Sequence, residues 1–326
     1  MLQYEHRKSS ICSLFTFLGM LLLLLCTPLS ATAKQIKYQH VPSATKNAFA
    51  YSWRVADTTY HLKFDIPASS FRQMPVTQPA FSNDIMQREI EVALLKHAQT
   101  IDPKTARIKV TRQATRIEYG VTSSSEKAGK TIMARLKTLS LEARETYLST
   151  HFYTDFTSEL GKSSIKHDHA KYAALSSVHL TPVVEAIQAM QQNNKDPREF
   201  IQLALSWMQS IPYNTLQSRV SSNGAGYVSP KDLLVQNQGD CDSKAAFLAS
   251  LLRAYNESVR QKMVLLPKHA LLAVAIRAKP GDKTIRHDGI EYVLLEAAGP
   301  GYFAIGEAAD NTLMGIRNRQ FSLEAM

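Results

Sequence analysis

Hydrophobic residues along this chain first form one long block and then fall into short periodic runs. The block covers residues 11–29, and residues 21–25 are an unbroken run of leucine. Between residues 48 and 67, large apolar residues alternate with polar or small ones, which predicts two strands joined by a turn at residues 57–59. A further stretch with strand character covers residues 106–122.

Apolar residues at helical spacing mark most of the remaining segments. They predict helices at residues 84–99, from 126 to beyond 147, at 181–194, 197–211 and 242–255, and a short helical turn at 230–234. Capping residues support three of these starts. Asp84 is placed to cap the first helix, Asp196 precedes a proline at the first helical position, and Ser229 precedes another.

The last third of the chain reads mainly as strands. Residues 262–266 and 291–297 have strand character, and residues 270–276 are apolar throughout, as in a central strand buried on both faces. Strands mixed with helices in this way predict an α+β fold.

The long apolar block has the flanks of a secretory signal peptide. Basic residues precede it, and the small residues Ala31 and Ala33 follow it at the spacing of a cleavage site. We therefore predict a signal peptide at residues 1–33, cleavage after Ala33 and a periplasmic location. A permanent membrane anchor and a lipid anchor on Cys26 are the alternatives, and no later segment is long and apolar enough to span a bilayer.

Charge adds little to this picture. The chain carries +10, and removal of Glu5, Arg7 and Lys8 with the signal leaves +9. The basic residues are scattered, so a general positive field is favoured over a dedicated anion site. No nucleic-acid recognition motif is present, and we expect no nucleic-acid partner.

A polar stretch at residues 158–169 is the best candidate for a linker. It divides the mature chain into an N-terminal α+β accessory domain, residues 34–165, and a second domain, residues 166–326. The stretch contains His167 and His169, but no further ligands follow at a recognisable metal-binding spacing. We expect a solvated turn there, and neither a metal nor a cofactor.

Cys241 is the one cysteine outside the predicted signal peptide, so an internal disulfide is excluded for the mature chain. It lies where a loop meets the start of a predicted helix. Unpaired N–H groups at a helix N-terminus favour a thiolate and stabilise an oxyanion, whereas the flanking Asp240 and Asp242 oppose a thiolate. A reactive thiol and a buried structural cysteine remain open from Cys241 alone.

A histidine and a carboxylate favour the reactive thiol. His269 opens the apolar strand at residues 270–276, and Glu296 lies near the end of the strand at residues 291–297. If the two strands pair with Ile276 near Gly289, His269 faces Glu296 within a residue or two. A nucleophile, a base and an orienting acid are then available.

These residues resemble the transglutaminase-like superfamily. The resemblance covers roughly residues 195–306 and is carried by Ile-Pro-Tyr at residues 211–213, Ser-Pro-x-x-Leu-Leu at 229–234 and Gly-Asp-Cys-Asp at 239–242, followed by His269 and Glu296. It implies a papain-like core in which a helix bearing the cysteine packs on a small antiparallel sheet. It also implies Cys241 as nucleophile, His269 as base and acid, and Glu296 as orienter. The chain departs from the pattern in having Leu271 two positions after the histidine and Glu rather than Asp as the acid. Tyr213 and Gln238 are candidates for stabilising the oxyanion or positioning the substrate.

The chemistry that follows is acyl transfer through a thioester. We expect an exported cysteine peptidase or amidase that acts on a protein or peptide, or on a component of the cell envelope. A protein-crosslinking transglutaminase and a non-catalytic module that binds peptide or cell wall are the alternatives. A metallohydrolase that uses His167 and His169 fits poorly, because the ligand spacing is wrong.

Overall fold

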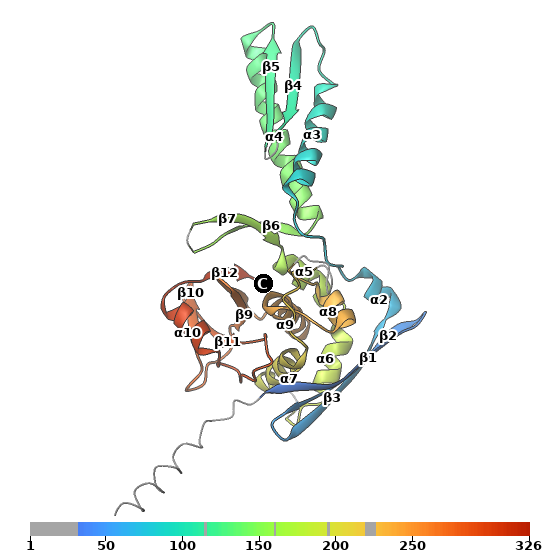
Figure 1. Ribbon diagram of the computed structural model, residues 1–326, viewed down its shortest axis with the longest axis vertical. Helices are drawn as coiled ribbons and strands as arrows, with labels where there is room; N and C mark the ends of the chain where they lie inside the picture. The colour runs from blue at the N-terminus through green and yellow to red at the C-terminus, as the bar shows by residue number, and fades with distance from the viewer. Residues whose placement is uncertain (1–31, 114–115, 160, 194–195, 219–225) are drawn as a thin grey trace, which may run out of the picture. The chain divides into compact units, whose positions relative to one another are not determined.

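The N-terminal part of the fold is a three-stranded antiparallel sheet. In the computed structural model, which describes residues 32–326 except 114–115, 160, 194–195 and 219–225, the strands β1 (Ala33–Pro42), β2 (Lys46–Val55) and β3 (Thr58–Pro67) lie in sequence order (Figure 1). The two strands predicted at residues 48–67 are confirmed, and β1 was not predicted. The apolar block at residues 11–29 lies outside the described residues. Within the described part, no helix is long and apolar enough to cross a membrane.

The alternation that predicted β2 and β3 buries one face of this sheet. Large aromatic and aliphatic side chains point to that face: Phe49, Tyr51, Trp53, Leu62, Phe64 and Ile66. Their neighbours along the strands are more exposed, as expected when one face packs on a core and the other faces solvent.

Two helices and a hairpin follow, around a separate cluster of buried residues. They are α3 (Asn83–Ala98), β4 (Ala106–Arg112), β5 (Ile117–Ser123) and α4 (Glu126–Thr150), preceded by the short α2 (Ala68–Gln73). The predicted helices are confirmed here, but Ser82 caps α3 in place of Asp84: its side chain accepts the Ile85 N–H. The single strand predicted at residues 106–122 is wrong, because its two halves fold back on each other as β4 and β5.

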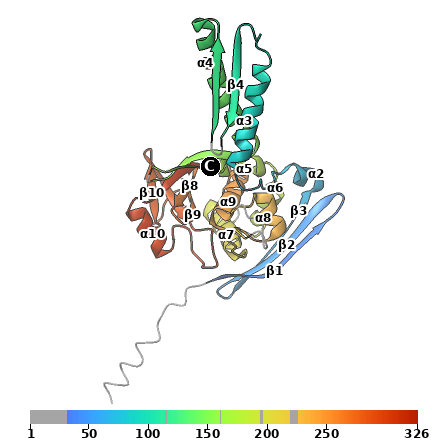
Figure 2. The ribbon, with the colours of Figure 1, turned by 45° about the horizontal axis from the view of Figure 1, so that its top comes forward.

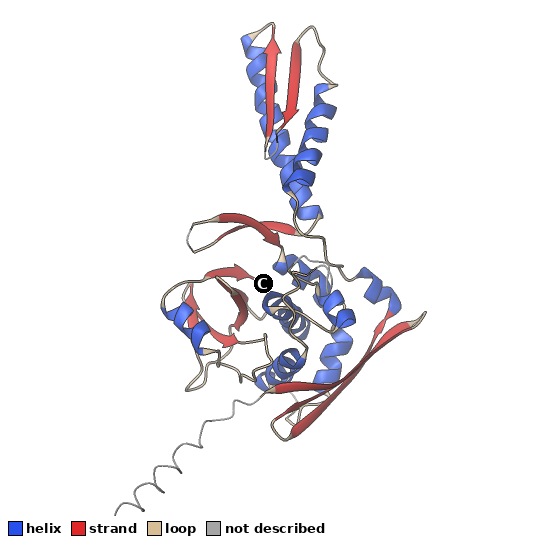
Figure 3. Cartoon of the chain, viewed as in Figure 1, coloured by secondary structure: helices blue, strands red, loops and turns tan. Residues whose placement is uncertain are grey.

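The predicted linker at residues 158–169 contains the second strand of another hairpin, whose first strand precedes it. Strands β6 (Tyr153–Thr157) and β7 (Ser163–His167) form an antiparallel hairpin (Figure 3). In its register, Tyr153 lies opposite His167. The boundary expected between residues 165 and 166 therefore falls inside β7. The solvated turn expected at His167 and His169 is also wrong, because the two side chains are buried.

Helices dominate the next part of the chain. They are α5 (His169–Ser177), α6 (Thr181–Gln188), α7 (Pro197–Ser210), α8 (Pro230–Gln236) and α9 (Cys241–Tyr255). Asp196 and Ser229 cap α7 and α8 through their side chains, as their sequence signatures predicted. Helix α6 ends at Gln188, earlier than the residue 194 expected from periodicity.

A five-stranded antiparallel sheet completes the fold. Its strands are β8 (Gln261–Leu266), β9 (His269–Val274), β10 (Thr284–His287), β11 (Ile290–Leu295) and β12 (Ser322–Ala325), in the spatial order β10-β11-β9-β8-β12. A further helix, α10 (Asp310–Arg317), precedes β12. The strand expected to be central, β9, lies in the middle of this sheet, and its residues from Ala270 to Val274 are buried. The fold is thus α+β, as predicted.

Helix α9 packs against β9 and also contacts α5, α7 and α8 (Figure 2). One large core joins these helices to the first sheet: Tyr51 and Phe64 both lie against Trp207 of α7, and Trp207 lies against Phe247 of α9. Residues 32–326 form one compact unit, and the sheet of β1, β2 and β3 shares this core. The packing holds both ends of α9 in place, including the end that carries Cys241.

Candidate active site

Cys241 is the first residue of α9, and Asp240 is its N-cap. The Asp240 side chain accepts the Ser243 N–H at 3.1 Å, which closes the first turn of the helix. The Cys241 side chain is partly exposed and has no disulfide partner. It therefore has the access that a nucleophile needs, together with the unpaired N–H groups of a helix end.

The loop before α9 is held by a short parallel bridge between Tyr213 and Gly239. The Gly239 N–H donates to the Pro212 carbonyl, and the Asn214 N–H donates to the Gly239 carbonyl, each at 3.2 Å. These backbone contacts bring Tyr213, 28 positions earlier in the sequence, beside Cys241.

Strand register brings His269 to Glu296. Leu295 lies opposite Leu272, so the ladder between β11 and β9 is shifted by two residues from the predicted pairing of Ile276 with Gly289. Glu296, just beyond β11, still meets His269: the ring Nε2 lies 2.8 and 2.9 Å from the two carboxylate oxygens. Glu296 is 2 % exposed, so this contact lies in an environment shielded from water.

The His269 ring also interacts with Cys241. Burial lowers the pKa of His269, but hydrogen bonds to Cys241 and Glu296 and the charges of both groups raise it to about 10. Because Nε2 is directed to Glu296, Nδ1 is the nitrogen left for the thiol. The structure thus brings together the three residues that the sequence singled out for catalysis.

Of the two residues proposed to stabilise the oxyanion, Tyr213 lies at the thiol. Burial, followed by the charges of Cys241 and Asp240 and a hydrogen bond to Cys241, raises the pKa of Tyr213 to about 12. The phenol therefore keeps its proton and is available as a donor at neutral pH. Its side chain is 46 % exposed, so an incoming substrate can reach it.

Gln238 has a different set of contacts. Its Oε1 accepts a hydrogen bond from Asn214 Nδ2 at 3.0 Å, and its Nε2 lies 3.5 Å from Gln236 Oε1. These contacts connect Gln238 to the segment that carries Tyr213.

Lys244 was not predicted, yet it lies one turn along α9 from Cys241 and is fully buried. Its Nζ donates to the carbonyl oxygens of Ile211 at 2.5 Å and Ala298 at 2.6 Å. Burial lowers its pKa to about 7, against the opposing effect of Asp240, Cys241 and Glu296. A lysine on the apolar face of the predicted helix, three residues after the cysteine, was the signal available in the sequence.

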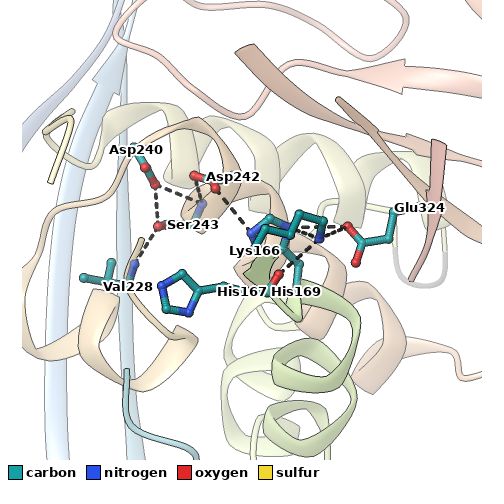
Figure 4. Close-up of polar contacts among 8 residues, drawn as sticks. All are labelled: Lys166, His167, His169, Val228, Asp240, Asp242, Ser243 and Glu324. Carbon is teal, nitrogen blue, oxygen red and sulfur yellow. Dashed lines mark hydrogen bonds and ion pairs between the residues drawn. The ribbon is translucent and has the colours of Figure 1, made fainter. Parts of the chain in front are cut away.

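The two aspartates beside Cys241 differ in charge state. Burial, followed by the charge of Asp242 and a hydrogen bond to it, raises the pKa of Asp240 to about 10, so Asp240 holds a proton. For Asp242, burial acts in the same upward direction, but hydrogen bonding to His169 and its charge prevail and lower the pKa. Figure 4 shows this network, in which Ser243 Oγ donates to Asp240 and accepts from the Val228 N–H. The opposition to a thiolate expected from both aspartates is therefore reduced, because one is neutral and the other is paired with a histidine.

The residues after Glu296 are kept close to α7 by a glutamine and a glycine. Gln209 Nε2 donates to the carbonyl oxygens of Glu296 at 2.8 Å and Phe303 at 3.0 Å. Gly299 has a φ of +59°, and a Cβ there would lie 2.0 Å from the Gln209 carbonyl oxygen. Only glycine fits this approach, which fixes the path of the segment that follows Glu296.

Metal-binding geometry is absent from the part of the chain that the structure describes: no group of three or more His, Cys, Asp or Glu side chains is arranged to hold an ion there. His167 and His169 in particular contact tyrosine rings and acidic side chains.

Comparisons of the chain with known protein families, with curated proteins and with solved structures find no match. The resemblance to transglutaminase-like proteins therefore rests on the sequence motifs alone.

The raised pKa of Asp240 leads to a prediction about how the stability of the fold depends on pH. Its pKa is raised in the folded state, so its contribution to stability is fully present below about pH 4 and is lost as the pH rises toward 10. Asp240→Asn keeps the capping oxygen but cannot ionise. We expect the free energy of unfolding of this variant, relative to the natural protein, to increase by at least ~1 kcal/mol between pH 5 and pH 8.

Urea unfolding of both proteins at several pH values measures this difference. Asp57→Asn, in the exposed turn between β2 and β3, is the matched control and should show no such trend. A difference for Asp240→Asn that does not change with pH would show that the carboxyl group is ionised in the folded protein.

Proposed function

We propose that this chain is a thiol-dependent acyl-transfer enzyme that hydrolyses a peptide or amide bond. The observation that carries the proposal is the His269 ring, which contacts Glu296 through Nε2 and interacts with Cys241 at the start of α9. A nucleophile, a general base and acid, and an orienting carboxylate then occupy one place, in the order this chemistry requires.

The first half of the reaction forms a thioester. The Cys241 sulfur attacks the carbonyl carbon, and a C–S bond forms as the carbonyl oxygen takes up negative charge. The Cys241 backbone N–H at the helix end and the Tyr213 hydroxyl stabilise that oxygen. When the C–N bond breaks, His269 gives its proton to the departing amine.

The second half restores the enzyme. His269, now neutral, accepts a proton from water as the water oxygen attacks the thioester carbon. The C–S bond then breaks, the carboxylic acid leaves and Cys241 regains the thiolate. Glu296 holds the ring orientation through both steps and stabilises its charged form.

Water is favoured over an amine as the acceptor in this proposal. Cys241 and Tyr213 are partly exposed, so solvent reaches the site. With the predicted export signal at residues 1–33, we place the activity in the periplasm, on peptides or on envelope components.

Acid-quenched mass spectrometry tests the proposal directly. The protein is incubated with a pool of peptides in ¹⁸O-labelled water and sampled on the millisecond to second timescale. We expect an acyl adduct on Cys241 and peptide products that carry ¹⁸O at a new carboxyl end. Products joined to an added primary amine in place of water would identify a crosslinking enzyme. Absence of both adduct and products, with peptide bound, would instead indicate a binding module.

Tyr213→Phe tests the role proposed for the phenol. The variant keeps the ring but removes the hydroxyl group, so it removes one donor to the oxyanion. We expect kcat to fall by about 10²-fold, with a much smaller change in KM, because the contact is made mainly in the transition state. Steady-state kinetics on a cleaved peptide measure both constants. If kcat/KM falls as far but only because KM rises, Tyr213 acts in ground-state binding.

A further inference from the structure

A cavity of about 360 Å³ lies near the N-terminal end of α9, the helix that begins with Cys241. It lies among the start of α9, the end of β8 and the hairpin of β6 and β7. Its volume is at the lower end of the range of about 300–1,000 Å³ found for pockets that hold small ligands. It is large enough for a side chain together with part of its backbone.

Two residues of the cavity lining are neighbours of proposed catalytic residues. Asp242, which directly follows Cys241, lines it, and so does Leu266, which pairs with His269 across the β8–β9 ladder. A peptide whose scissile amide lies between Cys241 and His269 would therefore pass the cavity within one or two residues of the bond that is cut.

The walls of the cavity are largely apolar. The lining includes Phe81, Phe156, Leu265 and Leu266. Within the hairpin, Phe156 and Lys166 project to the same face, because Lys166 lies opposite Thr154, which is two residues before Phe156 on β6. The Lys166 ammonium lies 6.0 Å from the Phe156 ring centre. These surfaces favour a large apolar ligand group.

The charged groups beside the cavity are paired with one another. Lys166 Nζ lies 2.8 Å from Glu324, and the His169 ring lies 3.3 Å from Asp242 and 3.4 Å from Glu324 (Figure 4). Two basic and two acidic side chains thus share three contacts, and His169 is only 3 % exposed. A charged ligand would have to compete with these partners and lose its own hydration, which disfavours Asp, Glu, Lys and Arg side chains.

We propose that this cavity is the specificity subsite of the enzyme and that it binds a large neutral apolar side chain, aromatic or branched aliphatic, next to the amide that is hydrolysed. The proposal rests on the proposed function and defines its substrate class: peptides with such a residue within two positions of the cleaved bond. Phe156, His169 and Asp242 are all part of the cavity lining.

Cleavage-site profiling tests the subsite. A synthetic peptide pool that presents Phe, Leu, Gly, Asp and Lys at each position around a central amide is digested, and the new ends are counted by mass spectrometry. The natural protein should show a preference of at least ~10-fold for Phe or Leu over Gly, Asp and Lys at one flanking position. Phe156→Asp should reduce this preference to less than ~3-fold, and the milder Phe156→Ser should give an intermediate value.

Two controls separate this proposal from the proposed function. Thr157→Asp adds the same charge at the next residue of β6, which is exposed and is not part of the cavity lining, and should keep the preference. Alkylation of Cys241 by iodoacetamide, a small reagent that does not need the subsite, should proceed at the same rate in all four proteins.

The possible outcomes differ clearly. Cleavage without a side-chain preference, or with one that Phe156→Asp leaves intact, overturns the subsite and leaves the hydrolase standing. No cleavage of any peptide by the natural protein, in a sample whose Cys241 is alkylated normally, overturns the hydrolase and the subsite with it.

Discussion

Replacing Cys241 with serine should lower the rate of peptide hydrolysis by ~10³-fold or more, with little change in the fold. The substitution exchanges one partly exposed sulfur for oxygen at the start of α9, where serine is well tolerated. A serine hydroxyl ionises far less readily than a thiol. His269 and Glu296, which can support a thiolate, therefore cannot generate an alkoxide as readily. The loss should therefore be in catalysis, because packing around the residue is preserved.

Initial rates on a cleaved peptide, together with the thermal unfolding midpoint, distinguish the two effects. We expect the midpoint to remain within a few degrees of that of the natural protein. Activity retained within ten-fold would mean that the nucleophile is another residue. A loss of activity that accompanies a large fall in the midpoint would assign Cys241 a structural role.

Glu296→Gln should have the second largest effect, a fall in kcat of about 10²- to 10⁴-fold. The variant keeps the shape of the side chain and a hydrogen-bonding oxygen but removes the charge 2.8 Å from His269 Nε2. Glu296 is among the groups that raise the pKa of His269 to about 10 against the effect of burial. Its neutralisation must therefore lower that pKa, and the imidazolium is lost at a lower pH.

The pH dependence of kcat/KM reports this change. The alkaline limb of the profile should move to lower pH in Glu296→Gln. The control is Glu291→Gln, which changes an exposed residue of β11, the strand that precedes Glu296, and should leave both rate and profile unaltered. If Glu296→Gln lowers the rate without any displacement of the alkaline limb, the carboxylate does not stabilise the charged ring.

Local signals in the sequence were sufficient for much of the helical structure. Asp196 and Ser229 were predicted as caps because a short polar side chain followed by proline has a specific role at a helix start, and this role does not depend on distant contacts. The cap of α3 was predicted wrongly, because Ser82 and Asp84 are both capping residue types and lie two positions apart. The backbone geometry selects Ser82.

Strand pairing was predictable only to within two residues. The ladder from Leu295 to Leu272 depends on the lengths of the turns and on β10, which pairs with the other edge of β11 and was not predicted. His269 and Glu296 nevertheless meet, because Glu296 lies beyond the last ladder pair, in a segment that can turn toward the histidine.

The buried polar residues could not be predicted from local pattern. Lys244 is buried because its partners are carbonyl groups of residues 33 and 54 positions away. His169 is buried because β7, α9 and the C-terminal strand all supply partners for it: Lys166, Asp242 and Glu324. In the sequence His169 belongs to a polar stretch, and only the tertiary contacts distinguish it from a solvated turn.

The most direct measurement is the rate at which iodoacetamide alkylates Cys241 at pH 6, compared between the natural protein and His269→Ala. The proposed pair of His269 and Cys241 predicts that, at pH 6, His269→Ala is alkylated at least ~10-fold more slowly than the natural protein. His179→Ala, which removes a histidine elsewhere in the fold, is the control and should match the natural protein. A thiol that is inert in the folded protein, or one whose rate at pH 6 is the same with and without His269, would contradict the proposed pair and the hydrolase built on it.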